Sequence, residues 1–135
     1  MPRYVALIDG KPGAYGVSFP DLPGCTAMGN TVEEALANAA DALADWASDA
    51  RAAGALPKPR AAAELRRRRD VRGALAKDAV LTLVPLILET GRAAKANLSL
   101  DDGLLAAIDE AARRRGVTRS AFLAAAAREK IAAGA

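Results

Sequence analysis

The sequence predicts an α+β fold in two parts, and three features of the chain support this prediction. Short apolar segments separated by glycine- and proline-containing turns open the chain, as in an antiparallel sheet. One long helical pattern follows at residues 32–53. A short alternating segment and two further helical patterns occupy residues 95–131. A chain of 135 residues has room for one domain and a small additional module.

The expected sheet lies in the first part of the chain. Residues 3–8 form an apolar run, and residues 9–13 have the composition of a loop. Residues 15–19 alternate as a half-buried strand does. A second turn at residues 20–24 leads to a third strand at residues 25–29. Because these connections are short, we expect an antiparallel meander.

A capping box marks the start of the long helix. Thr31 precedes Glu34 by three residues, the spacing at which a threonine side chain caps the helix and a glutamate supports it. Gly54 ends the helix. The residues expected to face the sheet are Leu36, Ala39, Leu43, Trp46 and Ala50.

The middle of the chain is expected to return to the sheet. A proline-rich bend at residues 56–59 precedes a stretch rich in alanine and arginine. Arg66 to Arg69 could contact DNA, although a solvated helix end is the simpler interpretation. Residues 80–87 form another apolar strand, and Pro85 lacks a backbone N–H, so this strand belongs at an edge or carries a bulge. Residues 89–92 are the predicted hinge between two domains.

Residues 95–100 alternate strictly between apolar and polar side chains, which predicts a strand. Its apolar face consists of Ala96, Leu98 and Leu100, and its polar face consists of Lys95, Asn97 and Ser99. A cation, a carboxamide and a hydroxyl provide the donors and acceptors that can read base edges in a major groove.

This small C-terminal segment is predicted to form a homodimer. Below about 40 to 50 residues, a chain rarely buries enough apolar surface to offset its conformational entropy. A single strand without a neighbour is also unstable in water. Pairing with the same strand of a second chain would give a two-stranded antiparallel ribbon.

Two helices follow the predicted strand. The first begins at Asp101 or Asp102 and ends at Gly116. Thr118 caps the second, and the backbone N–H groups of Arg119 and Ser120 lie in its first turn, where a phosphate can bind. The apolar faces of the two helices are Leu104, Leu105, Ile108 and Ala111 in the first, and Phe122, Leu123, Ala126, Ala127 and Ile131 in the second.

Through this strand, the Gly116–Ser120 turn and the capped second helix, the segment resembles the ribbon-helix-helix DNA-binding family. The resemblance implies that Lys95, Asn97 and Ser99 read bases. It also implies that Thr118, Arg119 and Ser120 hold phosphates. Asp101 stands where relatives often have proline, but it can still cap the helix. A DNA-binding dimer with twofold symmetry is expected to bind an operator with an inverted repeat. The alternative is an ordinary amphipathic helical hairpin preceded by a solvated strand.

Charge is unevenly distributed along the chain. Residues 1–50 hold two cations and seven anions, residues 51–90 hold nine and four, and residues 91–135 hold eight and five. An acidic front suits a basic protein partner, because complementary fields speed and orient encounter. The basic remainder favours phosphate.

Composition excludes several classes of site. There is no histidine and only Cys25 as a potential thiolate ligand, so zinc sites and histidine-based triads are excluded, and we expect no metal and no cofactor. A single cysteine fits the reducing cytoplasm. No apolar run reaches the roughly 18 residues that a membrane span needs, and no signal-peptide pattern opens the chain.

The front of the chain resembles the HicB antitoxin family. The resemblance rests mainly on residues 15–25, Tyr-Gly-Val-Ser-Phe-Pro-Asp-Leu-Pro-Gly-Cys, together with shorter matches at residues 4–6, 33–39, 56–59 and 83–85. It implies that residues 1–90 form a truncated ribonuclease-H-like domain, which blocks a HicA-like toxin ribonuclease, a compact basic protein. Residues 91–135 would bind operator DNA and repress the chain's own promoter. Whether dimers pair further into tetramers stays open.

Candidate toxin contacts are Asp9, Tyr15 and Asp21. A metal-dependent RNA hydrolase is the rival enzymatic interpretation, because several front carboxylates could hold metal ions. Capping already accounts for Glu33 and Glu34, so we expect no enzyme. A third possibility is a DNA-binding regulator whose front domain senses a small ligand. Co-purification with a small basic protein, rather than with a metabolite, distinguishes the antitoxin from this regulator.

Overall fold

The computed structural model of the chain describes residues 1–133. The chain divides into two compact units, residues 1–89 and residues 90–131. Within residues 1–133, no helix combines the length and the apolar character needed to cross a bilayer.

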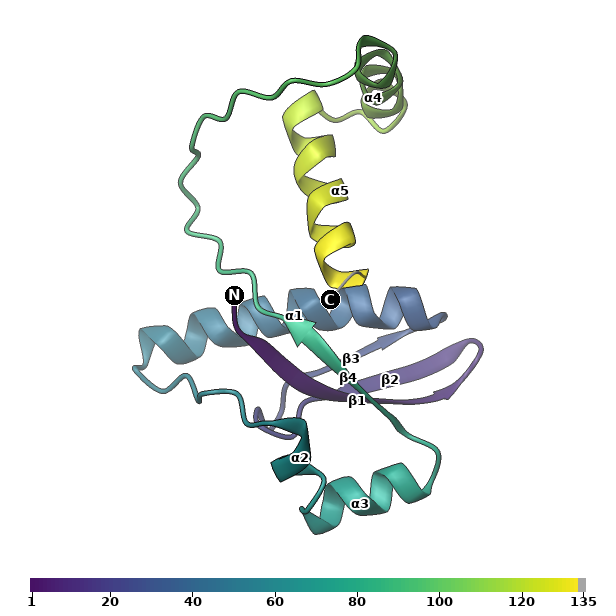
Figure 1. Ribbon diagram of the computed structural model, residues 1–135, viewed down its shortest axis with the longest axis vertical. Coiled ribbons are helices and arrows are strands. Elements are labelled where there is room, and N and C mark those ends of the chain that lie inside the picture. The colour runs from purple at the N-terminus through teal and green to yellow at the C-terminus, as the bar shows by residue number, and fades with distance from the viewer. Residues whose placement is uncertain (134–135) are drawn as a thin grey trace. The chain divides into compact units, whose positions relative to one another are not determined.

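The first unit is built on a four-stranded antiparallel sheet, as predicted (Figure 1). The strands are β1 (Arg3–Lys11), β2 (Ala14–Ser18), β3 (Thr26–Gly29) and β4 (Val80–Pro85), in the order β3-β2-β1-β4. Strand β4 is therefore an edge strand, which confirms the inference from Pro85. The first three strands form the expected meander, and β4 returns to pair with β1.

The first turn is tighter than predicted. Residues 9–11, expected in a loop, belong to β1, and Lys11 pairs with Ala14 across the hairpin. The turn itself is Pro12-Gly13, with Gly13 at a φ of +90°. Proline followed by a positive-φ glycine is the sequence that a type II turn requires. Strand pairing therefore continues through positions that composition alone assigned to a loop.

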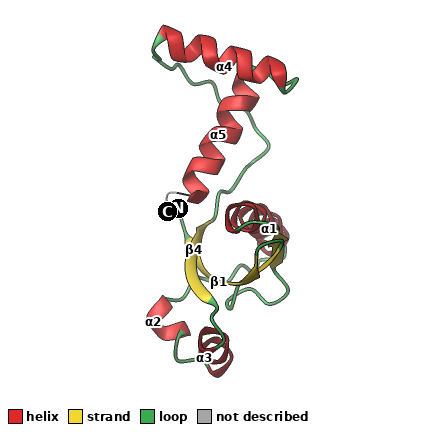
Figure 2. Ribbon diagram, turned by 90° about the vertical axis from the view of Figure 1, so that its right-hand side faces the viewer, coloured by secondary structure: helices red, strands yellow, loops and turns green. Residues whose placement is uncertain are grey.

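Helix α1 (Val32–Ala52) packs on one face of the sheet (Figures 1 and 2). Its predicted cap is confirmed, because the Glu34 N–H donates to Thr31 Oγ1 at 3.1 Å. The predicted buried face is confirmed at Ala39 and Leu43 and is wrong at its two ends. The fully buried positions are Ala35, Ala39, Leu43 and Ala47, and Leu36 and Trp46 are only partly buried. Small side chains on this stripe let the helix backbone approach the sheet.

Gly29 shows how closely helix and sheet approach. A Cβ atom at this position would clash with the Ala35 nitrogen and would lie 2.7 Å from the Ala35 Cα. The Asn38 side chain adds a hydrogen bond of 2.8 Å to the Met28 carbonyl oxygen. The start of α1 is thus fixed against the end of β3.

The opposite side of the sheet carries two short helices, α2 (Ala62–Leu65) and α3 (Arg69–Ala76) (Figures 1 and 2). Val5, which alternates with Tyr4 and Ala6, points away from α1 and is nevertheless buried. Each of the two helices also buries one large side chain, Leu65 in α2 and Val71 in α3.

The second unit contains α4 (Asp102–Arg114) and most of α5 (Arg119–Ala133). Asp101 caps α4, with its carboxylate accepting from the Gly103 and Leu104 N–H groups at 2.9 and 3.1 Å. The strand predicted at residues 95–100 is not formed in the single chain, where these residues have no regular secondary structure. A β-ladder needs a second strand, and no strand within residues 1–133 pairs with this segment.

Candidate functional sites

The predicted base-reading residues lie in the exposed segment 91–101, before α4. Lys95, Asn97 and Ser99 are all exposed, and none has a hydrogen bond or ion pair among the described residues. The leucines between them are exposed too, Leu98 by 64% and Leu100 by 40%. Polar and apolar side chains are therefore both available to a partner.

The turn between α4 and α5 is well defined. Gly116 adopts a φ of +67°, and the Val117 N–H donates to the Ala112 carbonyl oxygen at 3.0 Å. Thr118 Oγ1 accepts from the Ala121 N–H at 3.1 Å, which confirms Thr118 as the cap of α5. The Arg115 guanidinium lies 5.8 Å from the centre of the Phe122 ring. These contacts fix the direction in which α5 begins.

The Arg119 side chain is half exposed and forms an ion pair with Asp109 of α4. Its guanidinium makes two hydrogen bonds of 2.8 Å to the Asp109 carboxylate. The hydrogen bond from Arg119 lowers the pKa of Asp109, and the same contact raises the pKa of Arg119. The backbone N–H groups of Arg119 and Ser120 remain in the first turn, where a helix has no internal acceptors. Asp109 occupies Nε and Nη2 of Arg119, and the phosphate-binding role of Arg119 stays a prediction.

The predicted toxin-contact residues do not share one surface. Asp9 pairs with Gly16 and lies exposed on the sheet face opposite α1. Tyr15 pairs with Gly10 and Gly29 on the other face, where it packs partly against the core. Asp9 and Tyr15 therefore cannot contact the same flat partner surface across the sheet, and the toxin-binding role of each stays a prediction.

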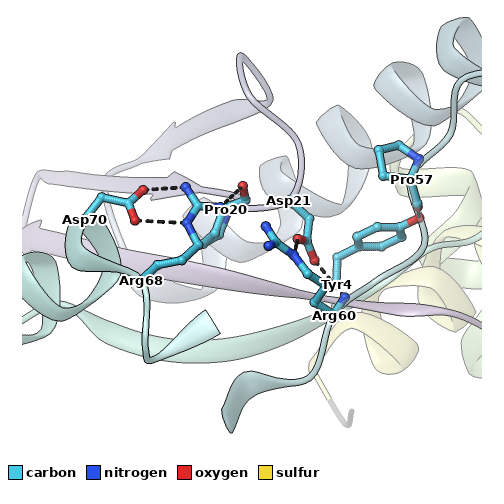
Figure 3. Close-up of polar contacts among 7 residues, drawn as sticks. All are labelled: Tyr4, Pro20, Asp21, Pro57, Arg60, Arg68 and Asp70. Atoms are coloured by element: carbon cyan, nitrogen blue, oxygen red, sulfur yellow. Dashed lines mark hydrogen bonds and ion pairs between the residues drawn. The ribbon is translucent and has the colours of Figure 1, made fainter. Parts of the chain in front are cut away.

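Asp21 has an internal role that the sequence did not reveal. Its side chain is only 3% exposed and both carboxylate oxygens are occupied, Oδ1 by Arg60 Nε at 2.5 Å and Oδ2 by the Arg60 backbone N–H at 2.8 Å (Figure 3). The hydrogen bond that Arg60 donates to Asp21 raises the pKa of Arg60. This pair fastens the turn after β2 to the segment that leads into α2. A toxin contact through Asp21 would have to break or bypass this pair.

Two further contacts fasten the same segment (Figure 3). The buried Tyr4 hydroxyl donates to the Pro57 carbonyl oxygen at 2.5 Å, and burial raises the pKa of Tyr4. Arg68 donates to the Pro20 carbonyl oxygen at 2.9 Å. Each contact joins residues about fifty positions apart in sequence.

Most carboxylates of the acidic front lie on the exposed side of α1. Asp41, Asp45 and Asp49 follow one another at intervals of four residues, and all three are exposed. Residues at this spacing lie on one side of a helix. The candidate toxin contacts were strand and turn residues, but the largest group of negative charges in residues 1–50 is this acidic stripe of α1.

The family of the chain follows from a family-model comparison. Residues 4–127 match the family described as "HicB_like antitoxin of bacterial toxin-antitoxin system". The chain belongs to this family. The resemblance found in residues 15–25 is thereby confirmed, as is the expectation that the chain is not an enzyme.

Solved structures of HicB proteins have the same fold. The antitoxin HicB of Burkholderia pseudomallei is 28% identical, with a TM-score of 0.55, and the alignment covers 97% of this chain and 99% of that one. Antitoxin HicB3 is 33% identical, with a TM-score of 0.53 and coverages of 96% and 97%. A toxin–antitoxin complex from Streptococcus pneumoniae matches in fold, at 22% identity, a TM-score of 0.51 and coverages of 95% and 97%. A comparison with curated protein sequences found no match.

Proposed function

We propose that this chain neutralises a HicA-like toxin ribonuclease through residues 1–90 and represses its own promoter through paired copies of residues 91–135. Family membership supports the first activity, as does fold similarity to chains whose structures are described as toxin–antitoxin complexes. The second activity depends chiefly on one observation: an extended, exposed segment with alternating side chains lies directly before two capped helices.

The exposed apolar side chains of the second unit support pairing of two chains. Of its helical residues, only Ile108 and Ala112 are buried, whereas Leu98, Leu100 and Leu104 are 64%, 40% and 51% exposed. Apolar groups left in water at this density favour association. In the proposed ribbon-helix-helix dimer, residues 95–100 of two chains form the ladder that one chain lacks. Lys95, Asn97 and Ser99 then project together toward the major groove.

Replacing Asn97 with alanine tests the DNA-binding proposal. Loss of the carboxamide removes a base contact, so operator binding should weaken by about 1–3 kcal/mol and discrimination at one base pair should relax. Titration of the full chain against its promoter and single-base variants measures both effects. The same variant should inhibit toxin ribonuclease activity as the wild type does.

Two outcomes would contradict this role for Asn97. Unchanged operator affinity would show that the segment does not read bases. Equal weakening against operator and unrelated DNA would show a contact without sequence information. An Ala94→Gly control changes an exposed position next to the predicted strand and should leave operator binding unchanged.

For the toxin-binding activity, the acidic stripe of α1 gives the first unit a surface suited to a basic protein. Like charges four residues apart destabilise a helix by a few tenths of a kcal/mol per pair, and a cationic partner relieves that repulsion. Complementary charge also speeds association. We therefore expect the toxin to approach along α1.

Replacing Asp41, Asp45 and Asp49 together with asparagine should slow toxin association at low salt by about tenfold or more. The difference should shrink as salt increases, because screening removes the advantage of the charged stripe. Stopped-flow mixing with a catalytically inactive toxin measures the association rate. A matched variant that neutralises Asp101, Asp102 and Glu129 in the second unit should leave the rate near that of the wild type. Equal rates for the wild type and the α1 variant at every salt concentration would show that the stripe has no such role.

A further inference from the structure

The turn between α2 and α3 carries a concentrated group of cations. Four exposed arginines, which we call the α2–α3 patch, lie within seven residues: Arg66, Arg67, Arg69 and Arg72. No ion pair or side-chain hydrogen bond holds any of them among residues 1–133. This differs from Arg60, Arg68 and Arg119, each of which has a carboxylate partner.

Arg68 explains why its neighbours remain unpaired. Its guanidinium makes two hydrogen bonds to the Asp70 carboxylate, at 3.0 and 2.6 Å, besides the one to the Pro20 carbonyl oxygen (Figure 3). The hydrogen bond from Arg68 lowers the pKa of Asp70, so that carboxylate stays charged and occupied. Arg68 therefore fastens the α2–α3 turn to the turn that follows β2. It also occupies Asp70, the one acidic residue of α3.

Helix α3 presents two patch residues on one open face. Arg69 and Arg72 are one turn apart on the exposed side of the helix, whereas Val71 is buried. Gly73 and Ala76 lie on the same exposed side and add almost no bulk. Nothing lies within 4 Å of a Cβ built at Gly73. A long ligand can therefore approach the helix backbone between the guanidinium groups.

The patch is chemically suited to phosphate. Each guanidinium offers five N–H donors in a planar arrangement that matches two phosphate oxygens. The closely spaced cations repel one another, and a bound polyanion would neutralise their charges and so relieve this repulsion. Across residues 60–77, once the internal pairs of Arg60 and Arg68 are set aside, five cations face one anion, Glu64.

We propose that the α2–α3 patch is a second DNA contact, which binds the phosphate backbone beside the operator. This inference rests on the proposed function, because the second unit must bring the chain to DNA. Residues 86–94 have no helix or strand and can span up to about 30 Å, close to one turn of duplex. Once the operator is bound, flanking phosphates are held near the patch at high effective concentration. A basic toxin would be repelled by the same surface.

The test compares two duplexes, the minimal operator and the operator extended by about one helical turn on each side. Full-length wild-type chain should bind the extended duplex more tightly, with a steeper dependence of log Kd on log salt concentration. Each guanidinium in contact adds about 0.9 to that slope. The variant with Arg66, Arg67, Arg69 and Arg72 replaced by glutamine should lose the added slope. It should bind the minimal operator as the wild type does.

A matched control replaces four exposed cations elsewhere in the first unit, Arg3, Lys11, Arg51 and Lys58, with glutamine. It removes the same net charge and should keep the preference for the extended duplex. Equal losses in both variants would overturn the inference, because net charge alone would then explain the effect. So would a wild-type chain that does not distinguish the duplexes. Failure to bind even the minimal operator would instead contradict the proposed function.

A toxin assay provides the last control. The patch variant should still inhibit the toxin and should unfold at the wild-type temperature, since no ion pair or side-chain hydrogen bond among residues 1–133 holds any of the four arginines. Loss of inhibition with unchanged DNA binding would show that the patch is a protein interface and would overturn the inference.

Discussion

Replacing Gly29 with alanine is expected to destabilise the first unit by about 3 kcal/mol or more, the upper end of the cost of overpacking. The new methyl group meets backbone atoms of Glu34 and Ala35, not the end of a flexible side chain. The start of α1 must therefore move away from β3, which disturbs the hydrogen bond from Asn38 to Met28. Urea unfolding followed by the fluorescence of Trp46, the sole tryptophan, reports on this unit specifically.

Gly73 provides the matched control for Gly29. It lies within α3, is exposed, has an ordinary helical φ and has open space at its Cβ position. Alanine there should stabilise α3 by about 0.5–1 kcal/mol, because glycine loses more backbone entropy in a helix. If Gly29→Ala proved as stable as the wild type, the close approach of α1 to β3 would be wrong.

Replacing Asp21 with alanine should cost about 2–3 kcal/mol of stability, because two hydrogen bonds to a buried, charged carboxylate are lost together. The segment from Pro57 to Arg68 should then loosen, and its backbone amides should exchange hydrogen faster. Toxin affinity of the folded protein should change little if Asp21 acts only within the chain. Calorimetric titration with an inactive toxin, at a temperature where the variant is folded, separates stability from binding.

Two further variants complete this test. Asp70→Ala removes an ion pair in which the Arg68 side chain is 36% exposed and the Asp70 side chain is 62% exposed. Because solvent screens such a pair, this variant should lose much less stability than Asp21→Ala. Asp9→Ala changes an exposed carboxylate that has no hydrogen bond or ion pair with any other described residue, so any loss of toxin binding there reflects a contact with the toxin. A stable Asp21→Ala protein that no longer binds toxin would restore Asp21 as a direct contact residue.

Local signals in the sequence predicted the elements of the fold well. Thr31, Asp101 and Thr118 each cap the helix they were expected to cap, because capping depends on residues within three or four positions. Pro85 identified the edge strand for a similarly local reason, its missing donor. The buried face of α1 was less predictable. Ala35 is buried in place of Leu36, because the close approach of α1 at Gly29 favours a small side chain there. Further along the helix, Ala47 is fully buried and Trp46 only partly.

Contacts between residues far apart in the chain could not be predicted from the sequence. Asp21 has the composition of a turn residue, and only the fold brings Arg60 to it across 39 positions. Asp109 and Arg119 likewise meet only because the turn at Gly116 reverses the chain. Segment 95–100 shows a different limit. Its alternation predicts a strand, but a strand forms only when a second segment pairs with it. In the proposed dimer, that second segment belongs to another chain.

That unpaired segment has a consequence for gene control. If operator recognition requires two chains to complete one ladder, the amount of recognition-competent protein below the dimer dissociation constant varies with the square of chain abundance. A twofold fall in abundance then removes about three quarters of the competent form. Inhibition of the toxin by single chains falls only in proportion. Repression would therefore be lost faster than inhibition of the toxin, and new antitoxin would be made while inhibitor is still present.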